Sequence, residues 1–257
     1  MNRRTAISTL ALAAAPAIAG PVGLRLPGGF DPRQILGLQL WLDASQIVGL
    51  NDGDSVGTWS DLSGNANDAT QGTASKKPLY KTAIVNGKPV VRFDGVDDFL
   101  SNATLTALNG VSAATLFTVK KETTYTGISF PFYTAANLYK FNVGGTRYYR
   151  TSATEDANAS SSTLWGSWTY EGMLYDGSQS GNSNRLKVRS NGSPLAVGYT
   201  GTIQSTLGSG TGFYVSTYDG TTYPWNGDVA EIILFNRAVT GADLTNLEAY
   251  LASKYGL

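Results

Sequence analysis

The sequence predicts an all-β protein: an antiparallel β-sandwich of the jelly-roll type, with an extended N-terminal arm and a short C-terminal helix. Three observations predict this fold. Short segments of alternating apolar and polar residues recur along the chain, clusters of Gly, Asn and Asp separate them, and no fixed-period repeat or shift in composition divides the chain. One domain of this length can bury a self-sufficient core. We therefore expect an arm at residues 1–36 and a single sandwich domain at residues 37–257.

The N-terminal segment allows two interpretations. Asn2-Arg3-Arg4 is a short basic region, residues 5–19 are small or apolar, and Ala17-Ile18-Ala19 before Gly20 is typical of a signal-peptide cleavage site. The alternative is an uncleaved arm that packs on a neighbouring subunit. Because the sequence retains Met1, we expect the arm. The Gly- and Pro-rich residues 21–35 predict an extended, irregular connector outside the core.

The sandwich strands are expected from period-two patterns. Leu38, Leu40 and Leu42 alternate with other residues, as expected for a strand with unlike faces. Asn191-Gly192 is a strong hairpin signal. The further strands are expected at residues 88–93, 113–120, 138–143, 168–175, 185–190, 212–217 and 228–235.

One helix is expected, at the C-terminus. Thr240 is the expected N-cap, and Asp243 completes a capping box three residues later. Gly256 is a suitable C-terminal stop. The expected buried face consists of Leu244, Leu247, Tyr250 and Leu251.

Composition excludes several classes of function. The chain has no Cys and no His, so disulfides, thiolate metal sites and His-based catalytic triads are excluded. Its 19 basic and 19 acidic residues balance, so there is no basic field to attract nucleic acid. The apolar N-terminal run is too short and Ala-rich for a stable membrane span.

Three ordered motifs carry a family resemblance. They are Leu40–Ala44 with Trp59–Thr70, then Val91–Leu100, and then Asn226–Arg237 followed by the C-terminal helix. Together they resemble the laminin-G-like or concanavalin A-like lectin jelly-roll domains of phage virion proteins and bacterial surface proteins. The resemblance covers about residues 37–257. It implies the fold, whereas the function stays open among lectins, adhesion modules, glycosidases and structural parts.

The resemblance also implies calcium at an edge of the sandwich. Asp61 is the expected carboxylate donor of one loop, where Asn65, Asn67 and Asp68 could add oxygens, and Asp94, Asp97 and Asp98 are the donors of another. The alternative is that these residues only shape their turns by bonding to the backbone.

An aromatic and polar cluster is the expected ligand site. It comprises Tyr218, Asp219, Tyr223, Trp225 and Asn226, between two expected strands. Trp165 with residues 151–163 is the second candidate. For Trp225 the alternative is packing over the end of a sheet, and Trp41, Trp59 and Trp168 are expected in the core.

Catalysis is not expected. A glycosidase needs two carboxylates across the scissile bond, but the strand at 228–235 offers only Asp228 and Glu231, which are expected on opposite faces. Glu231 is expected on the face of Val229 and Ile233, in a structural ion pair with Arg92 or Arg237.

The leading functional hypothesis is a non-enzymatic virion surface protein, such as a phage head-decoration or fibre-like component. Its arm would contact other virion proteins or another copy of the chain, and its sandwich would bind cell-surface glycans or stabilise neighbouring subunits. The alternative is an exported bacterial carbohydrate-binding or adhesion protein, secreted or on the cell surface. A glycosidase is the least favoured hypothesis.

Overall fold

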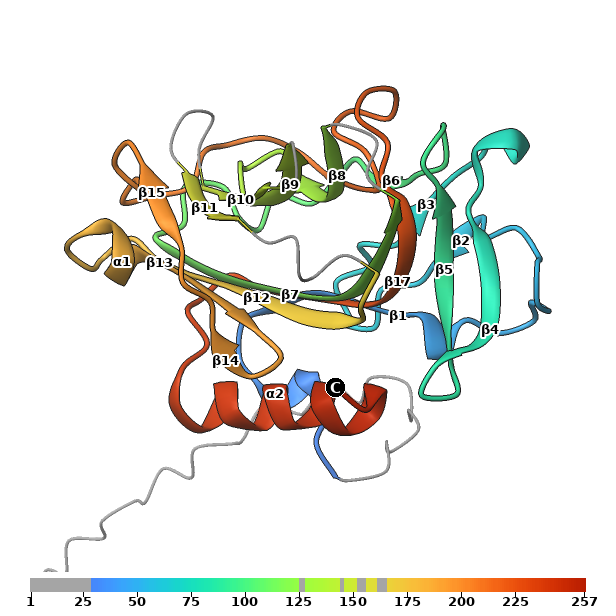
Figure 1. Cartoon of the computed structure of the whole chain (residues 1–257), viewed down its shortest axis with the longest axis horizontal. Helices are drawn as coiled ribbons and strands as arrows, with labels where there is room; N and C mark the ends of the chain where they lie inside the picture. The colour runs from blue at the N-terminus through green and yellow to red at the C-terminus, as the bar shows by residue number, and fades with distance from the viewer. Residues whose placement is uncertain (1–28, 125–127, 144–145, 152–155, 161–165) are drawn as a thin grey trace, which may run out of the picture.

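The fold is a sandwich of two antiparallel β-sheets with one helix packed on its outer side (Figure 1). It was analysed as a computed structural model, which describes residues 29–124, 128–143, 146–151, 156–160 and 166–257. The predicted all-β fold with a C-terminal helix is confirmed. Within this part of the chain, no helix is both long and apolar enough to cross a membrane.

The first sheet has eight strands, and its long central strands β7 and β17 pair along most of their length. β5 pairs with the beginning of β17, and β1 pairs with its end. The strands are β1 (Leu38–Asp43), β4 (Leu79–Val85), β5 (Lys88–Asp94), β7 (Ala113–Thr124), β12 (Thr169–Asp176), β13 (Leu186–Ser190), β14 (Ser193–Pro194) and β17 (Asn226–Phe235).

The second sheet has nine strands in the spatial order β15-β11-β10-β9-β8-β16-β6-β3-β2. In chain order they are β2 (Thr58–Trp59), β3 (Ala69–Thr70), β6 (Leu100–Asn102), β8 (Ser129–Thr134), β9 (Tyr139–Val143), β10 (Thr146–Arg150), β11 (Asp156–Ser160), β15 (Gly198–Thr200) and β16 (Phe213–Val215). Four short helical segments connect strands or lead into them: η1 (Pro32–Gln34), η2 (Ala44–Gln46), η3 (Ala74–Lys76) and α1 (Asn182–Arg185).

Every strand expected from the sequence is present, although its ends shift by a few residues. The Asn191-Gly192 hairpin joins β13 to β14, and both residues have positive φ, 45° and 75°. This is the conformation that a two-residue hairpin turn favours. The strands that the pattern missed include β8 and β10. Their sequences are aromatic or charged on both faces and lack a clean alternation.

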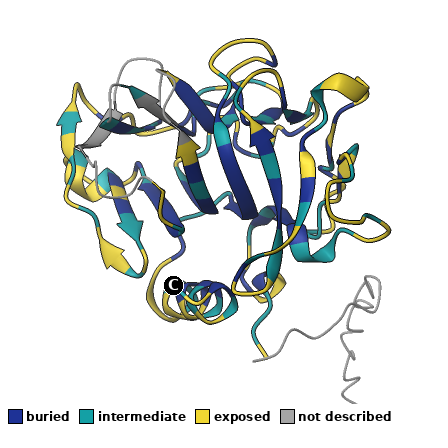
Figure 2. Cartoon of the chain, turned by 45° about the vertical axis from the view of Figure 1, so that its right-hand side comes forward, coloured by how far each residue is buried: buried dark blue, intermediate teal, exposed yellow. Residues whose placement is uncertain are grey.

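The main core lies between the two sheets. Leu40 and Leu42 of β1 point into it, as the alternation predicted. Leu38, which was expected on the same face, packs instead in the core on the outer side of the first sheet, because the pairing of β1 with β17 shifts between Leu38 and Leu40. Trp59 and Trp225 are fully buried in the same core. Figure 2 shows buried residues concentrated along the central strands and exposed residues in the loops at the margins.

A second core lies between the first sheet and helix α2 (Gly241–Tyr255), which runs beneath β7, β12 and β17 in Figure 1. Leu247 and Leu251 are buried there as predicted, and Leu244 and Tyr250 are half-buried against the same core. Trp41 is buried in this core and Trp168 packs against it, as expected. Gly256 ends the helix in the left-handed conformation, with φ 68°.

The predicted capping box is wrong. Thr240 is the N-cap residue, but its side chain makes no capping hydrogen bond. The Asp243 carboxylate instead lies 3.7 Å from the guanidinium of Arg237.

The end of the expected connector belongs to the core. Pro32 and Ile35 are buried, and the Phe30 ring packs 5.6 Å from the ring of Tyr250. The Arg33 guanidinium lies over the indole of Trp41 at 5.6 Å. The expectation that these residues stay outside the core is therefore wrong. Residues 1–28 of the expected arm lie outside the described residues.

Glu231 forms one of the polar contacts between helix α2 and the first sheet; Arg189 of β13 forms another, with Glu248. The Glu231 carboxylate accepts hydrogen bonds from Trp41 Nε1 (2.6 Å), Tyr250 OH (2.8 Å), Tyr255 OH (2.7 Å) and Lys254 Nζ (2.8 Å). Lys254 Nζ also donates to Asp43 Oδ2 at 2.6 Å. An ion pair was expected, but its predicted partners are wrong: Arg92 pairs with Asp228 and Arg237 with Asp243.

The expected faces of β17 also need correction. The pairing of β17 with β7 shifts between Val229 and Glu231. Val229 consequently faces the inter-sheet core, whereas Glu231 and Ile233 face helix α2. Asp228 pairs across the sheet with Arg92 and shares this outer face, so Asp228 and Glu231 do not point to opposite faces. A β-bulge adds one residue and reverses the alternation.

Charged residues also lie between the two sheets. We call Lys120, Glu122, Lys140, Arg147 and Glu171 the inter-sheet charge cluster, and each is at most 2% exposed. The Glu171 carboxylate accepts a hydrogen bond from Arg147 and lies 3.4 Å from Lys120 Nζ and 3.9 Å from Lys140 Nζ. Burial, with the charge of Arg147 second, lowers the pKa of Lys120 to about 7.

Candidate functional site

The loop that follows β16 carries the predicted ligand residues, and it divides them between surface and core. Tyr218 is 38% exposed and Tyr223 is 44% exposed. Trp225 is 0% exposed and packs in the inter-sheet core, 6.4 Å from the ring of Phe93. Trp225 therefore lies where the alternative interpretation placed it, as a packing residue in the core. Asn226 is half-buried at the start of β17.

Asp219 shapes this loop. Its Oδ1 accepts hydrogen bonds from Thr221 N (2.9 Å), Thr221 Oγ1 (2.9 Å) and Thr222 N (2.7 Å). Partial burial raises the pKa of Asp219, but the hydrogen bonds from Thr222 and Thr221 outweigh it and lower the pKa below its usual value. Asp219 is therefore an ionised turn residue at neutral pH, and its other oxygen remains an acceptor.

The loop tyrosines lie on aromatic residues of the second sheet. The Phe130 ring is 5.1 Å from Tyr218 and 5.7 Å from Tyr223, and the Tyr133 ring is 4.6 Å from Tyr218. Tyr139 of β9 completes the group, 5.1 Å from Tyr133 and 5.7 Å from Phe130. We call these five residues the aromatic face. They lie on the outer side of β8 and β9. The rings of Phe130, Tyr133 and Tyr139 support those of Tyr218 and Tyr223, which are partly exposed.

An irregularity in β8 explains why these rings point outward. Phe132 faces the inter-sheet core, so strict alternation would place Phe130 in the same core. The register of β8 against β9 shifts between Ser129 and Phe132, and Phe130 packs instead with Tyr139 in a separate cluster outside the main core. Sequence reasoning missed Phe130, Tyr133 and Tyr139. The one available signal was the density of aromatic residues at 130–139.

The loop continues over a second pair of rings. Tyr214 of β16 pairs across the sheet with Tyr133, and its ring lies 6.1 Å from that of Phe99. Gly220 has φ +88°, and a Cβ there would lie 3.2 Å from the ring of Phe99 and 3.4 Å from that of Tyr214. Glycine therefore lets the loop backbone lie close to both rings.

The three aspartates of the second predicted calcium loop lie together. One carboxylate oxygen from each of Asp94, Asp97 and Asp98 lies within 4.8 Å of the others. Two calcium ligands on opposite sides of an ion, each about 2.4 Å from it, are roughly this far apart. Burial, and then the charges of Asp94 and Asp97, raise the pKa of Asp98 to about 6. The carboxylate oxygens are of the kind that a hard cation binds. Asp94 Oδ1 also accepts backbone hydrogen bonds from Val96, Asp97 and Asp98, so this loop matches the turn-shaping alternative as well.

Asp61 lies in a different loop and is occupied by hydrogen bonds. Its carboxylate accepts from Trp41 N (2.9 Å), Ser63 N (2.9 Å), Ser63 Oγ (2.7 Å) and Asn67 N (3.0 Å). Asp68 similarly accepts a hydrogen bond from Asp61 N at 2.8 Å. These contacts are those of turn-shaping residues. The structure does not bring Asp61 to the other three aspartates.

The acidic loop adjoins the aromatic loop. Asn226 pairs with Asp94 at the start of β17, and its side-chain amide donates to the Asp94 carbonyl oxygen. Phe99, which directly follows Asp98, contacts Tyr214. Two of the predicted sites therefore share one end of the sandwich. The other candidate, Trp165 with residues 151–163, lies outside the described residues except for Thr151 and the backbone of β11.

Comparisons with known proteins find likeness in structure and not in sequence. No protein-family model matches the chain, and no curated protein sequence matches it. A sialidase from Trypanosoma rangeli is similar over 86% of this chain and 33% of its own, with TM-score 0.55 and 14% identity. The chain thus spans about a third of the sialidase.

Two further solved domains have similar TM-scores. The binding domain of botulinum neurotoxin serotype D matches 83% of this chain and 52% of its own, with TM-score 0.55 and 9% identity. Domain 4 of an extracellular arabinanase from Geobacillus stearothermophilus, solved in complex with arabinotriose, matches 82% of this chain and 98% of its own, with TM-score 0.54 and 16% identity.

These likenesses establish a β-sandwich fold that carbohydrate-recognising proteins also use. At 9–16% identity they show the fold and no more, because one fold hosts many functions. The function must therefore be argued from the side chains of this chain.

Proposed function

We propose that the chain is a non-catalytic carbohydrate-binding domain that contacts glycans through its aromatic face. The observation that carries this proposal is the pair of partly exposed tyrosines, Tyr218 and Tyr223, held against the buried ring of Phe130. Sugar rings present C–H groups that pack on aromatic rings, while tyrosine hydroxyls bond to sugar hydroxyls.

The rings of the aromatic face are preorganised for binding. Phe130 and Tyr139 are nearly buried, at 6% and 4% exposure, and they fix the more exposed rings in place. A rigid aromatic surface loses little side-chain entropy when a ligand docks, so more of the contact energy is available for affinity. The ionised carboxylate of Asp219 lies in the same loop as Tyr218 and Tyr223 and adds a hydrogen-bond acceptor there.

The proposal of a non-catalytic role rests on the state of the carboxylates near this face and on β17. A general acid in a glycosidase needs a raised pKa, whereas the hydrogen bonds of Asp219 lower its pKa. Asp98 in the adjoining loop does have a raised pKa, but we propose that its carboxylate holds a calcium ion. Asp228 and Glu231 lie on the outer face of the first sheet and are engaged by Arg92 and Lys254. The arabinanase domain solved with arabinotriose, matched over nearly its full length, supports a binding role.

The test is a glycan array followed by calorimetry with the tightest-binding oligosaccharide. Tyr218→Ala and Tyr223→Ala should each weaken binding about tenfold, since loss of one stacking ring costs roughly 1.4 kcal/mol. Leu36→Ala removes a side chain that is 78% exposed but lies outside the aromatic face, and it should bind normally. Unchanged affinity in both tyrosine variants would refute the proposal.

We also propose that Asp94, Asp97 and Asp98 hold a calcium ion beside this site. Burial and mutual repulsion disfavour ionisation of Asp98, and a divalent cation would relieve both effects. Because Asn226 links this loop to the aromatic loop, the ion would hold the edge of the binding surface in place.

For location, we propose the surface of a virus particle, as the sequence resemblance implies. An exported bacterial protein is the alternative. Quantitative mass spectrometry of purified particles should find the chain at a fixed ratio to the major capsid protein. A mature chain that begins near Gly20 in the culture medium would favour export instead.

A further inference from the structure

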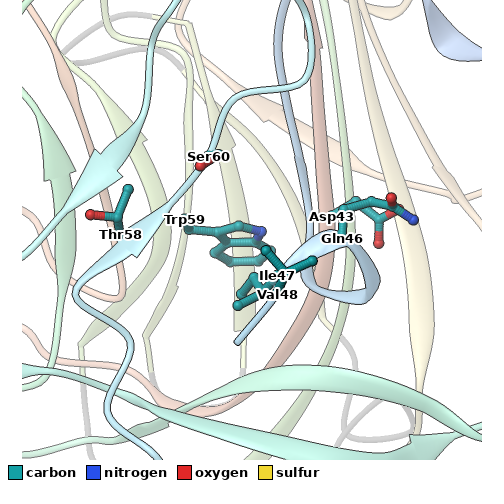
Figure 3. A pocket seen from close by; sticks show the side chains of 7 residues that line it. All are labelled: Asp43, Gln46, Ile47, Val48, Thr58, Trp59 and Ser60. Carbon is teal, nitrogen blue, oxygen red and sulfur yellow. The ribbon is translucent and has the colours of Figure 1, made fainter. Parts of the chain in front are cut away.

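β15 and β2 are the two outermost strands of the second sheet. A cavity of about 240 Å³ opens beside β2. It is lined by two segments: the end of β1 with the residues that follow it, and β2 with the residue that follows it (Figure 3). They are Asp43, Gln46, Ile47, Val48, Thr58, Trp59 and Ser60. In Figure 3 the indole of Trp59 lies in the middle of the group, with Thr58 on one side and Gln46 on the other.

The one carboxylate of the lining is already bonded to other groups of the chain. Asp43 Oδ1 accepts hydrogen bonds from Ser45 N (2.9 Å) and Ser45 Oγ (2.7 Å), and Oδ2 forms an ion pair with Lys254 Nζ at 2.6 Å. The remaining polar groups of the cavity are the Gln46 amide and the hydroxyls of Thr58 and Ser60. Such groups both donate and accept hydrogen bonds and do not select a charge.

Trp59 leaves a hydrogen-bond donor unused. The residue is 0% exposed, and its Nε1 has no acceptor within the part of the chain that the structure describes. Buried donors of this kind are nearly always paired, and Trp41 Nε1 has Glu231 as its acceptor. Trp225 Nε1 also lacks an acceptor, but Trp225 does not line the cavity.

The size and chemistry of the cavity restrict its ligand. At about 240 Å³ it is smaller than the roughly 300–1,000 Å³ that takes a drug-sized molecule, so only a single small ring fits. One wall is apolar, from Ile47, Val48 and the Trp59 ring, and the rim carries an amide and two hydroxyls. A neutral sugar has the same division between apolar C–H and polar O–H groups.

We propose that this cavity is a second, independent carbohydrate site that takes one neutral sugar residue. A hydroxyl oxygen of that sugar would accept the hydrogen bond from Trp59 Nε1 once the loop of Ile47 and Val48 adjusts around it. Val48 is 87% exposed, whereas Ile47 packs against the inter-sheet core, so the adjustment has to shift Ile47 as well as Val48. Strands β3, β6 and β16 separate β2 from β8 and β9, the strands of the aromatic face, so the two sites do not overlap.

The experiment is a ¹H–¹⁵N NMR titration of the whole chain, read at the tryptophan indole signals. The chain has five Trp residues, and Trp59→Phe identifies the signal of Trp59. The ligands are glucose, galactose, mannose, arabinose and N-acetylglucosamine. Glycerol is the control for non-specific effects of a small polyol. At least one sugar should shift the Trp59 signal saturably, while glycerol should not.

Two variants test the lining and one separates the sites. Thr58→Val keeps the shape of an exposed side chain but removes its hydroxyl, and Gln46→Ala removes the amide. Each should weaken binding about three- to tenfold, the usual effect of one lost hydrogen bond. Tyr223→Ala, which damages the aromatic face, should leave the Trp59 titration unchanged.

The outcomes are decisive for each site. An unmoved Trp59 signal with all five sugars, or a shift that glycerol reproduces, overturns the second site. Equal affinity of the Thr58→Val and Gln46→Ala variants with the native chain also overturns it. If Trp59 responds while Tyr218→Ala and Tyr223→Ala bind glycans normally, the second site stands and the proposed role of the aromatic face fails.

Discussion

At the scale of single residues, neighbouring side chains decide which aromatic residues can meet a ligand. Tyr223 is 44% exposed, whereas Trp225, two positions later, is fully buried. Both belong to one aromatic and polar cluster in the sequence. The difference arises because Trp225 enters the inter-sheet core beside Phe93, while Tyr223 lies on the outer ring of Phe130. Composition identifies the cluster but not which of its members face solvent.

The acidic loop gives a prediction at the same scale. Calcium at about 100 times its dissociation constant should add roughly 2.7 kcal/mol to the free energy of unfolding, which is about 5–11 °C in Tm for a domain of this size. Differential scanning calorimetry with calcium and with a chelator measures the increment. Asp98→Asn should abolish it.

Asp61→Asn is the matched control for this loop. It removes a turn-shaping acceptor and should lower Tm equally with and without calcium. A calcium increment that survives in Asp98→Asn would argue against the proposed ion site.

At the scale of elements, the position of helix α2 depends on a polar contact as well as on its apolar face. Lys254 joins Glu231 of β17 to Asp43 of β1, and all three side chains are at least 93% buried. Burial lowers the pKa of Lys254, but the charges of Glu231 and Asp43 outweigh it and raise the pKa above 10.5. The helix therefore binds the sheet through a charged and solvent-excluded contact.

Removal of the Lys254 charge should loosen this helix. Lys254→Met leaves two buried carboxylates without their cation and should cost about 3–5 kcal/mol of stability in urea denaturation. Lys187→Met, which changes an exposed lysine of β13, should cost less than about 1 kcal/mol. An equally small loss in Lys254→Met would contradict the structural role of this contact.

The same contact has a defined pH dependence. Since the folded pKa of Lys254 is raised, its stabilisation is fully present below the unfolded value of 10.5 and is lost as pH rises through the folded value. Tyr250 and Tyr255 also have raised pKa values, first because of burial, and they act in the same direction. Circular dichroism above pH 10 should show stability falling more steeply in the native chain than in Lys254→Met.

At the scale of the whole molecule, charged contacts join the two sheets across their interface. Glu171 belongs to the first sheet, whereas Lys140 and Arg147 belong to the second. Lys140 Nζ also donates to Thr118 Oγ1 (2.8 Å) and to the Glu171 carbonyl oxygen (2.9 Å), both in the first sheet. The relative position of the sheets therefore depends on a buried charge in addition to the apolar core.

Glu171→Gln should be among the most destabilising substitutions in the chain. It removes the carboxylate that contacts Arg147, Lys120 and Lys140 and should cost about 3–5 kcal/mol. Asp52→Asn breaks the more exposed ion pair with Lys81 and should cost much less stability, because solvent screens exposed pairs. Chemical denaturation of both variants gives the comparison, and similar losses would contradict the role of Glu171 in joining the sheets.

The sequence by itself determined the fold class, most strands of the first sheet, the Asn191-Gly192 hairpin, the C-terminal helix and the grouping of Asp94, Asp97 and Asp98. These features depend on neighbours in the chain: side chains alternate along a strand, and turn residues set their own backbone. Only the tertiary structure decided the partners of Glu231, the outward turn of Phe130 and the cavity beside Trp59. Each depends on a register shift or on contacts between distant segments, and a single bulge reverses the face that alternation predicts.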